Sequence, residues 1–357
     1  MTGDRNHREF QVRFSADFRN DVGGMVFPDI GLSLLDNIAG LSYGFVQEYR
    51  AEYTSEQLHN CDVLISLKPR ITTTSLEGVD RLCAIGRCGV GYDNVDLLGC
   101  TQNDIAVFIT PAGVVRPVAE SIVLFVLALS HNLVLKDRLV RQGRWGESSS
   151  SLGREPRDRV VGTVGLGNIA SAAIQLLKNF DVARFLAFDP YASEETAHKL
   201  GVELVPLAEL LRHSDYVLIN CPLTPQTRGL IGKREFSLMK PDSVLINTAR
   251  GPIVNENALI EALEKKIIRA AALDVFEQEP LSTGSRLVMM DNVILTSHSI
   301  AWTEELFRDM GRIDCEGALS IYRGEAPKNV VNPDVLSRPG FLRKLENHRV
   351  LFGGSAQ

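Results

Sequence analysis

Residues 159–170 read RVVGTVGLGNIA, a valine-rich run that enters a glycine turn and then a helical pattern. In a strand–turn–helix unit of this kind the first glycine, Gly165, permits the tight turn, and the second, Gly167, lets the backbone approach a pyrophosphate. Ala170 provides the small residue that close packing of helix on strand needs at the third position. Amides at the start of the following helix then face the phosphates, aided by the helix dipole. The stretch predicts a dinucleotide-binding turn.

A second apolar run, ARFLAFDP (183–190), places an acid, Asp189, about 20 residues beyond that turn. A carboxylate there accepts hydrogen bonds from the ribose 2′-hydroxyl of NAD and repels the 2′-phosphate of NADP. Pro190 and Tyr191 follow, so no arginine stands next to it to bind such a phosphate. The predicted cofactor is therefore NAD.

From about residue 112 to 300 the chain alternates short apolar strands with helical segments. The strands are rich in Val, Ile and Leu, as strands buried on both faces must be. We predict strands at 160–164, 185–188, 216–220, 243–247, 270–273 and 292–295, and helices at 169–179, 194–200, 207–213 and 256–265. Such alternation predicts an α/β domain with a doubly wound parallel sheet.

An earlier region, from about residue 10 to 110, has the same rhythm, with apolar stretches such as VLISL (63–67) and IAVFIT (105–110). After residue 302 the chain becomes helical and amphipathic, and we expect it to return to this first region, which makes that domain discontinuous. The resulting division is a first domain at 1–111, a dinucleotide-binding domain at 112–300, a return segment at 301–335 and a loose tail at 336–357.

The segment from Arg116 to Arg141 lies between the two regions and begins RPVAESIVLFVLALSHNLVL. It is apolar almost all round, so we expect a buried helix. Two partners are open for it: the rest of its own chain, or a second subunit.

Composition sets the outer limits. The chain has 357 residues, 45% hydrophobic and 23% charged, which is typical of a globular protein of two domains. Its net charge of −6 disfavours a nucleic-acid partner. The longest apolar run, Ile122 to Leu129, is short of the ~20 residues of a membrane span. MTGDRNHREF (1–10) lacks the apolar stretch of a signal peptide.

The six cysteines are scattered, with no CxxC pair and no histidine cluster nearby. They are typical of reduced thiols in a cytoplasmic protein, and no metal site is predicted.

Three loops carry side chains suited to catalysis. INTARGPIVNENAL (246–259) contains Arg250, AALDVFEQEP (271–280) contains Asp274, Glu277 and Glu279, and NVILTSHSIAWTEE (292–305) contains His298. Each loop follows a predicted parallel strand, and ligands of open α/β sheets bind beyond the carboxyl ends of the strands. We therefore expect these side chains to converge.

The set matches the reduction of a 2-keto acid, which needs a hydride at the carbonyl carbon and a proton at its oxygen. Histidine suits the proton donor because its ordinary pKa lies near neutrality. A carboxylate beside it holds the ring and favours its charged form. A guanidinium can bind the substrate carboxylate and polarise the carbonyl.

The sequence resembles the D-isomer-specific 2-hydroxyacid dehydrogenase family over roughly residues 60–305. The matching stretches are GRCGVGYDNVDL (86–97), TPAGVVRPVAESIVLFVLALS (110–130), VGLGNIA (164–170), CPLTPQTRGLIG (221–232), MKPDSVLINTARGPIVNENAL (239–259), ALDVFEQEP (272–280) and the segment around His298. The resemblance implies a Rossmann-type NAD-binding domain, a discontinuous flavodoxin-like substrate domain acting as a lid, and a homodimer formed through the Arg116–Arg141 region.

The resemblance also implies roles for individual residues. Arg250, Glu279 and His298 would be catalytic, with Glu279 preferred to Glu277 because the family's acid directly precedes a proline. Cofactor contacts would come from Gly165, Gly167, Asn168, Ile169, Asp189, Cys221, Pro222, Thr227, Thr248, Ala249, Asp274, His298 and Ala301. Substrate contacts would come from Val90, Gly91, Lys68 and Arg250.

Some positions depart from the family pattern. Val114 stands where many members carry an asparagine, and Ser297 replaces the usual proline before the histidine. These changes bear on substrate choice more than on chemistry. Lys68 and Arg70 match basic residues of phosphoglycerate-type members, so the favoured substrates are phosphoglycerate or glyoxylate and hydroxypyruvate.

Two other functions stay open. One is an NAD(H)-sensing interaction protein of the corepressor type, which keeps the same catalytic residues. The other is a phosphite dehydrogenase. Formate chemistry is disfavoured because formate-type members carry an amide where this chain has Glu279.

Overall fold

The computed structural model describes residues 8–353, with the backbone alone for residues 148 and 150. Within this range the chain forms two compact units, one of residues 8–114 with 303–353 and one of residues 115–302. The ends of the chain, 1–7 and 354–357, lie outside the described residues. The signal-peptide argument and the last part of the predicted tail fall partly on them.

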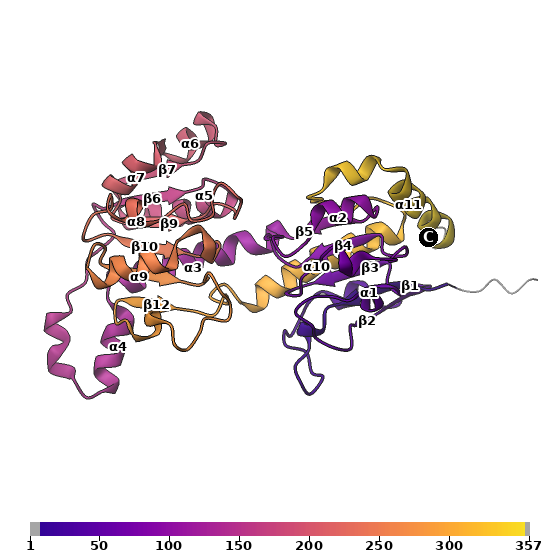
Figure 1. The fold of residues 1–357 in the computed structure, drawn as a ribbon, viewed down its shortest axis with the longest axis horizontal. Helices are drawn as coiled ribbons and strands as arrows, with labels where there is room; N and C mark the ends of the chain where they lie inside the picture. The colour runs from indigo at the N-terminus through magenta and orange to yellow at the C-terminus, as the bar shows by residue number, and fades with distance from the viewer. Residues whose placement is uncertain (1–7, 354–357) are drawn as a thin grey trace, which may run out of the picture. The chain divides into compact units, whose positions relative to one another are not determined.

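The unit of residues 115–302 is built on a seven-stranded parallel sheet (Figure 1). Its strands are β6 Val160–Val164, β7 Arg184–Phe188, β8 Val202–Leu204, β9 Tyr216–Ile219, β10 Val244–Asn247, β11 Ala270–Leu273 and β12 Val293–Leu295. They lie in the order β12-β11-β10-β9-β6-β7-β8. The order reverses between β6 and β9, which is the switch point where doubly wound sheets bind their ligands.

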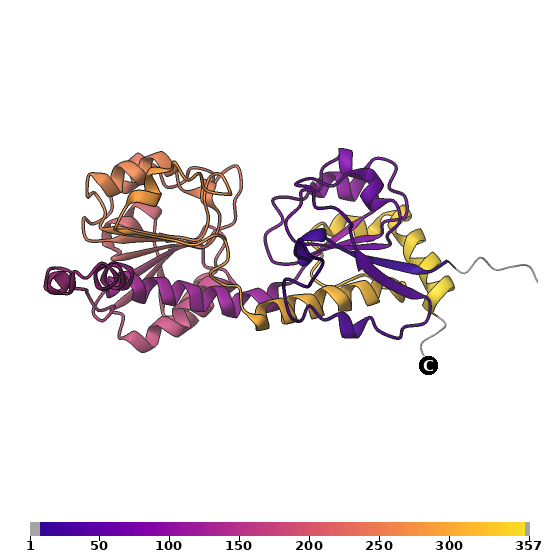
Figure 2. The same ribbon diagram turned by 90° about the horizontal axis from the view of Figure 1, so that it is seen from below.

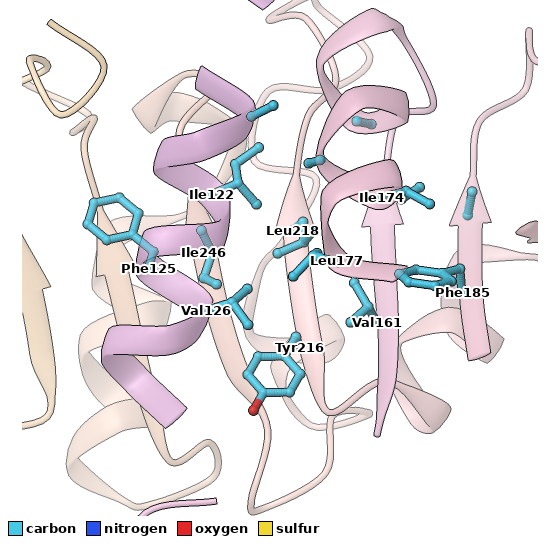
Figure 3. Close-up of a cluster of buried hydrophobic side chains, with 14 of the residues drawn as sticks. Ile122, Phe125, Val126, Val161, Ile174, Leu177, Phe185, Tyr216, Leu218 and Ile246 are labelled. Atoms are coloured by element: carbon cyan, nitrogen blue, oxygen red, sulfur yellow. The ribbon is translucent and has the colours of Figure 1, made fainter. Parts of the chain in front are cut away.

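Helices cover both faces of this sheet, as Figure 2 shows. The covering helices are α3 Pro111–Ser130, α5 Asn168–Leu177, α6 Glu194–Leu200, α7 Leu207–His213, α8 Lys233–Phe236 and α9 Glu256–Glu264, while α4 Leu133–Arg141 projects away from the sheet. Short 3-10 helices lie at Trp145–Ser150, Lys178–Phe180, Gly251–Ile253 and Arg286–Met289. Tyr216 and Leu218 of β9 pack with α3, α5 and α6 (Figure 3), while Val217 and Ile219 pack with α7, α8 and α9. Burial on both faces explains the unbroken apolar runs of the sequence.

The other unit has a five-stranded parallel sheet in the order β2-β1-β3-β4-β5. Its strands are β1 Phe10–Phe14, β2 Leu41–Phe45, β3 Val63–Ser66, β4 Ala84–Arg87 and β5 Ala106–Ile109. Its helices are α1 Ser55–Leu58, α2 Leu97–Gln102, α10 Glu304–Tyr322 and α11 Pro339–Phe352, with 3-10 helices at Ala16–Phe18, Leu32–Leu34, Thr74–Leu76 and Pro333–Ser337. This is the flavodoxin-like strand order. The predicted fold class, a doubly wound domain with a flavodoxin-like one, is therefore confirmed.

The C-terminal segment completes the five-stranded unit. After α10 the chain runs beside β5, where the Val331 amide donates to the Val107 carbonyl at 2.8 Å. The Asn332 side chain accepts from the Val107 amide, also at 2.8 Å. These bonds join residues more than 200 positions apart in the sequence.

The predicted loose tail is wrong for most of its length. Residues 339–352 form α11, which buries Phe341, Leu345, His348 and Phe352. Their spacing of four, three and four places all of them on one face of a helix, and that face packs on the unit. The apolar period was present in the sequence, but the charged residues between those positions obscured it.

The expectation of one helix from Arg116 to Arg141 is also wrong. The chain breaks at Asn132, whose φ of +52° is left-handed. The Asn132 side-chain amide donates to the carbonyls of Ser151 and Leu152 at 3.2 and 2.9 Å, which holds the break in place. The segment therefore forms α3 and the separate α4.

By length and composition, α3 could cross a membrane, and half of its apolar stretch is buried in the protein. Figure 3 shows Ile122, Phe125 and Val126 directed at the strands of the sheet. The core helix of an α/β unit has the same length and composition, so this feature alone is weak support for a membrane span.

Candidate active site

The glycine turn lies between β6 and α5, at the switch point of the seven-stranded sheet. Gly165 has φ +97°, and a Cβ added to it would lie 2.7 Å from the Cys221 backbone nitrogen, so a larger residue does not fit. A Cβ on Gly167, in contrast, would meet no atom within 4 Å. One glycine thus packs against the end of β9, and the other borders open space.

The start of α5 faces that open side. The Gly167 carbonyl accepts the first helical hydrogen bond, from the Ser171 amide at 2.9 Å. The amides of Asn168, Ile169 and Ala170 precede that bond and so have no partner within the helix. Free amides at a helix N-terminus can bind a pyrophosphate, and the open side of Gly167 leaves room for it. The described residues therefore fit a dinucleotide.

Asp189 is fastened beside the turn. One carboxylate oxygen accepts from the Leu166 amide and the other from the Tyr191 amide, each at 2.8 Å. Each oxygen keeps a further lone pair, because a carboxylate offers about four acceptor sites. The side chain can therefore hold the turn and also accept from a hydroxyl group.

The loop after β9 lies against the glycine turn through Cys221. Burial raises the pKa of the Cys221 thiol to about 11, so it is neutral at physiological pH. The Thr227 hydroxyl donates to the Pro222 carbonyl at 2.7 Å and accepts from the Thr224 amide at 2.8 Å, which folds the loop on itself. These predicted cofactor residues thus share one edge of the sheet with the turn.

Arg250 follows β10 in a turn built by the buried Asn247. The Asn247 side chain accepts from the Ala249 amide and donates to the Arg250 carbonyl, both at 3.0 Å. Thr248 lies within the turn that these two bonds close. A Cβ on Gly251 would lie 1.9 Å from the Phe276 carbonyl carbon. The turn therefore packs tightly against the loop that carries Glu279.

His298 and Glu279 form a pair: the imidazole Nδ1 lies 2.8 Å from a Glu279 carboxylate oxygen. The second oxygen of Glu279 accepts from the Phe276 amide at 3.0 Å. Burial raises the pKa of the Glu279 carboxyl, but the hydrogen bond and charge of His298, the Phe276 amide and the charge of Arg250 together lower it below its usual value. Glu279 is thus a carboxylate, and Arg250 is close enough for its charge to act on it.

Asp274 clamps the loop that carries His298. One of its oxygens accepts from the Thr296 hydroxyl at 2.6 Å and from the Ser299 and Ile300 amides at 2.9 and 3.2 Å. Its other oxygen accepts from no residue in the described part of the chain. The clamp holds His298 in a left-handed conformation, φ +55°, that non-glycine residues seldom adopt.

Sequence reasoning missed Thr296 and Asn247. Both are polar residues at or just beyond the end of an apolar strand, directly before a candidate catalytic loop, and that position was the available signal. Ala301, a predicted cofactor contact, follows the clamped residues in the same loop. Arg250, Glu279 and His298 all belong to residues 115–302.

The predicted substrate residues Val90, Gly91 and Lys68 belong to the other unit. Val90 and Gly91 follow β4, and Lys68 follows β3, the neighbouring strand. The Asn94 side-chain amide donates to the carbonyls of Lys68 and Pro69 at 3.2 and 3.1 Å, which ties the two loops together. The Lys68 side chain is exposed. Among residues 8–353 no group of three His, Cys, Asp or Glu side chains is arranged to hold a metal ion.

Comparison with known proteins decides the family. A model of the D-isomer specific 2-hydroxyacid dehydrogenase NAD-binding domain matches residues 123–299. A glyoxylate reductase of Korarchaeum cryptofilum is 35% identical over 292 residues, which are 80% of this chain and 88% of that protein. The chain belongs to the D-isomer specific 2-hydroxyacid dehydrogenase family.

Two further comparisons agree with this assignment. A D-3-phosphoglycerate dehydrogenase of Methanocaldococcus jannaschii is 37% identical over 279 residues, or 78% of this chain, but the match spans only 53% of that protein. The crystal structure of the TT0316 protein of Thermus thermophilus superposes with a TM-score of 0.80 at 26% identity, covering 90% of this chain and all of that one. As a 2-hydroxyacid dehydrogenase the protein is an NAD-dependent oxidoreductase that acts on a CH–OH group.

Proposed function

We propose that this dehydrogenase interconverts a small D-2-hydroxy acid and its 2-keto acid, with His298 as the acid–base group, Glu279 as its partner and Arg250 as the anchor of the carboxylate. The 2.8 Å contact between His298 Nδ1 and Glu279 carries the proposal, because it leaves Nε2 as the ring nitrogen for a substrate. The effect of the Arg250 charge on Glu279 supports a common site for all three.

Each side chain then has one task. NADH, when bound, supplies the hydride to the carbonyl carbon. His298 donates a proton from Nε2 to the carbonyl oxygen, while Glu279 accepts from Nδ1 and stabilises the charged ring. Arg250 presents a planar fork that matches a carboxylate and draws electron density from the carbonyl. Asp274 keeps His298 in its strained conformation through Ser299 and Ile300.

The relatives support a choice of substrate. Glyoxylate reductases match this chain over most of their length, whereas the D-3-phosphoglycerate dehydrogenases span about twice the matched region. Because the identities are similar, at 35% for a glyoxylate reductase and 37% and 36% for two D-3-phosphoglycerate dehydrogenases, we propose phosphoglycerate or glyoxylate and hydroxypyruvate as substrates. The exposed ammonium of Lys68 and the Val90 and Gly91 amides would meet the anionic end of the substrate.

A turnover screen tests the proposal. NADH oxidation is followed with glyoxylate, hydroxypyruvate, pyruvate, phenylpyruvate and 3-phosphohydroxypyruvate, and NAD⁺ reduction with phosphite. We expect the highest kcat/KM with one of the small keto acids. NADH binding without turnover of any of them would favour an interaction protein of the corepressor type, and NAD⁺ reduction by phosphite would favour the phosphite reaction.

Variants test the roles. His298→Ala should lower kcat by a factor of about 10²–10⁴, the usual contribution of a positioned general acid, with NADH affinity little changed. Arg250→Lys should raise KM and lower kcat, because a point charge cannot replace a bidentate fork. If His298→Ala lost NADH binding to the same extent as kcat, His298 would have a structural role. If Arg250→Lys had unchanged kinetics, Arg250 would not bind the substrate.

We also propose a cytoplasmic homodimer. The cysteines are free thiols, in keeping with a reducing compartment. Leu133, Val134 and Val140 of α4 are exposed apolar side chains, which suits a surface covered by a second subunit.

A further inference from the structure

A buried hydroxyl group lies beneath the loop that contains Val90 and Gly91. Thr110 directly follows β5 and is fully buried. Its hydroxyl oxygen accepts from the Gly89 amide at 2.8 Å and donates to the Gly89 carbonyl at 3.3 Å. The Thr110 amide donates to the same carbonyl at 2.9 Å. Both backbone groups of Gly89 are therefore satisfied by one residue.

These bonds extend the sheet beyond its last regular pair. The ladder between β4 and β5 ends with Arg87 opposite Ile109. On the other side of β4, the Cys88 amide donates to the Ser66 carbonyl of β3 at 3.0 Å. Cys88 is thus hydrogen-bonded to β3, and Gly89 is hydrogen-bonded to the residue that follows β5.

Gly89 needs that support because its backbone has φ +133°, a conformation that favours glycine. Glycine also has the most freedom in the absence of a restraint. The two residues after it, Val90 and Gly91, are half-buried and lead to the exposed Tyr92. The direction of their amides therefore depends on how firmly Gly89 is held.

We propose that Thr110 is a positioning residue that sets the Val90 and Gly91 amides for the carboxylate of the substrate. The inference rests on the proposed function, in which those two amides meet the substrate. Thr110 itself touches no substrate, because its side chain is buried and its hydroxyl is engaged with Gly89.

Two substitutions separate the hydroxyl from the shape of the side chain. Thr110→Val keeps the β-branched volume and removes the hydroxyl, so the Gly89 amide loses its acceptor. Thr110→Ser keeps the hydroxyl and removes a methyl group. As a matched control, Thr101→Val removes a hydroxyl that donates to the Leu97 carbonyl at 2.7 Å and accepts from the Asn332 side-chain amide at 3.0 Å, away from Gly89.

Steady-state kinetics give the first readout. We expect Thr110→Val to raise KM for the keto acid about tenfold, the equivalent of one lost hydrogen bond. The Kd of NADH should not change, and Thr110→Ser should restore KM to within about twofold of the wild type. The proposal would be overturned if Thr110→Val left KM unchanged. It would also be overturned if Thr110→Ser and Thr101→Val raised KM as much as Thr110→Val does.

Hydrogen exchange gives a readout that needs no turnover. In Thr110→Val the amides of residues 89–91 should exchange faster than in the wild type, in Thr110→Ser and in Thr101→Val. Oxalate, a dicarboxylate probe, should protect Val90 and Gly91 in the wild type and less so in Thr110→Val. If the wild type reduces no keto acid, the proposed function fails. If exchange at residues 89–91 is the same in all variants, the anchoring role of Thr110 fails instead.

Discussion

Asp189 combines two tasks in one carboxylate. It accepts from the amides on either side of it, Leu166 in the glycine turn and Tyr191 in its own loop, and this places a negative charge beside the predicted ribose site. We expect that charge to favour NAD over NADP, because it would repel a 2′-phosphate.

The first prediction concerns that preference. Asp189→Ser combined with Tyr191→Arg removes the carboxylate and adds a guanidinium at a side chain that is 93% exposed and so tolerates the change. The ratio of kcat/KM for NADPH to that for NADH should rise about tenfold or more. Asp189→Asn, which keeps an acceptor for the turn, is the control and should move the ratio less. If this ratio did not change in the double variant, Asp189 would not contact the ribose.

Asp314 on α10 is a buried acid that the proposed chemistry does not use. Apart from the neighbouring Cys88 thiol, neither of its carboxyl oxygens has a hydrogen-bond partner within the described chain. Burial raises its pKa to about 8, and the neighbouring Cys88 thiol and Arg87 guanidinium offset this only in part. The native state therefore keeps a proton that the unfolded chain releases near pH 4.

The second prediction follows from that proton. Between pH 5 and about 8 the native state binds more protons, so the carboxyl lowers stability as pH rises, by at most about 1.4 kcal/mol per pH unit. Asp314→Asn cannot lose a proton. The free energy of unfolding of Asp314→Asn, measured in urea, should therefore increase relative to that of the wild type as pH rises. This difference should level off above pH 8. Parallel pH profiles for the two proteins would contradict a protonated Asp314.

At the scale of single elements, α11 is a helix that packs on its unit through one face. Phe341 is fully buried, whereas Val350 on the same helix is 74% exposed. The helix therefore has one face that stabilises the five-stranded unit and one that does not.

The third prediction compares those faces. Phe341→Ala should lower the free energy of unfolding by about 3–5 kcal/mol, the usual effect of removing a buried phenylalanine. Val350→Ala should change it by less than about 0.5 kcal/mol. Urea unfolding checks both. A small effect of Phe341→Ala would mean that α11 is dispensable and that the expectation of a loose tail was functionally right.

At the scale of the whole molecule, the proposed dimer depends on α4 and the residues after it. Leu133 and Val140 are 55% and 50% exposed, and Trp145 is 75% exposed. Apolar side chains grouped in this way usually mark a surface that another chain covers.

The fourth prediction tests this surface. Leu133→Glu with Val140→Glu should shift the mass measured by sedimentation from dimer to monomer, because two carboxylates from each subunit would be buried without partners. Val350→Glu, at a more exposed apolar position on α11, should leave the mass unchanged. If the wild type sedimented as a monomer, the proposed homodimer would be wrong.

Sequence reasoning succeeded where the signal is local. The extents of β6, β11, α6 and α7 agree with the predicted ranges, because short runs of Val, Ile and Leu between helical segments are typical of a buried parallel sheet. The short edge strand β8 was missed because three residues carry too little pattern. Arg250, Glu279 and His298 were selected from their places after parallel strands, and within residues 115–302 the last two do form a pair.

The order of residues along the chain determined the short apolar strands, the glycine turn after β6 and the acid at the end of the next strand, because each is recognised from a pattern of a few neighbouring residues. Tertiary structure alone decided the clamp of Asp274 on the His298 loop, the bonds of Thr110 to Gly89 and the burial of α11. Their partners are 22, 21 and more than 200 residues away. Such pairs form only when separate strand ends and helix faces are brought together by packing, and no local preference specifies them.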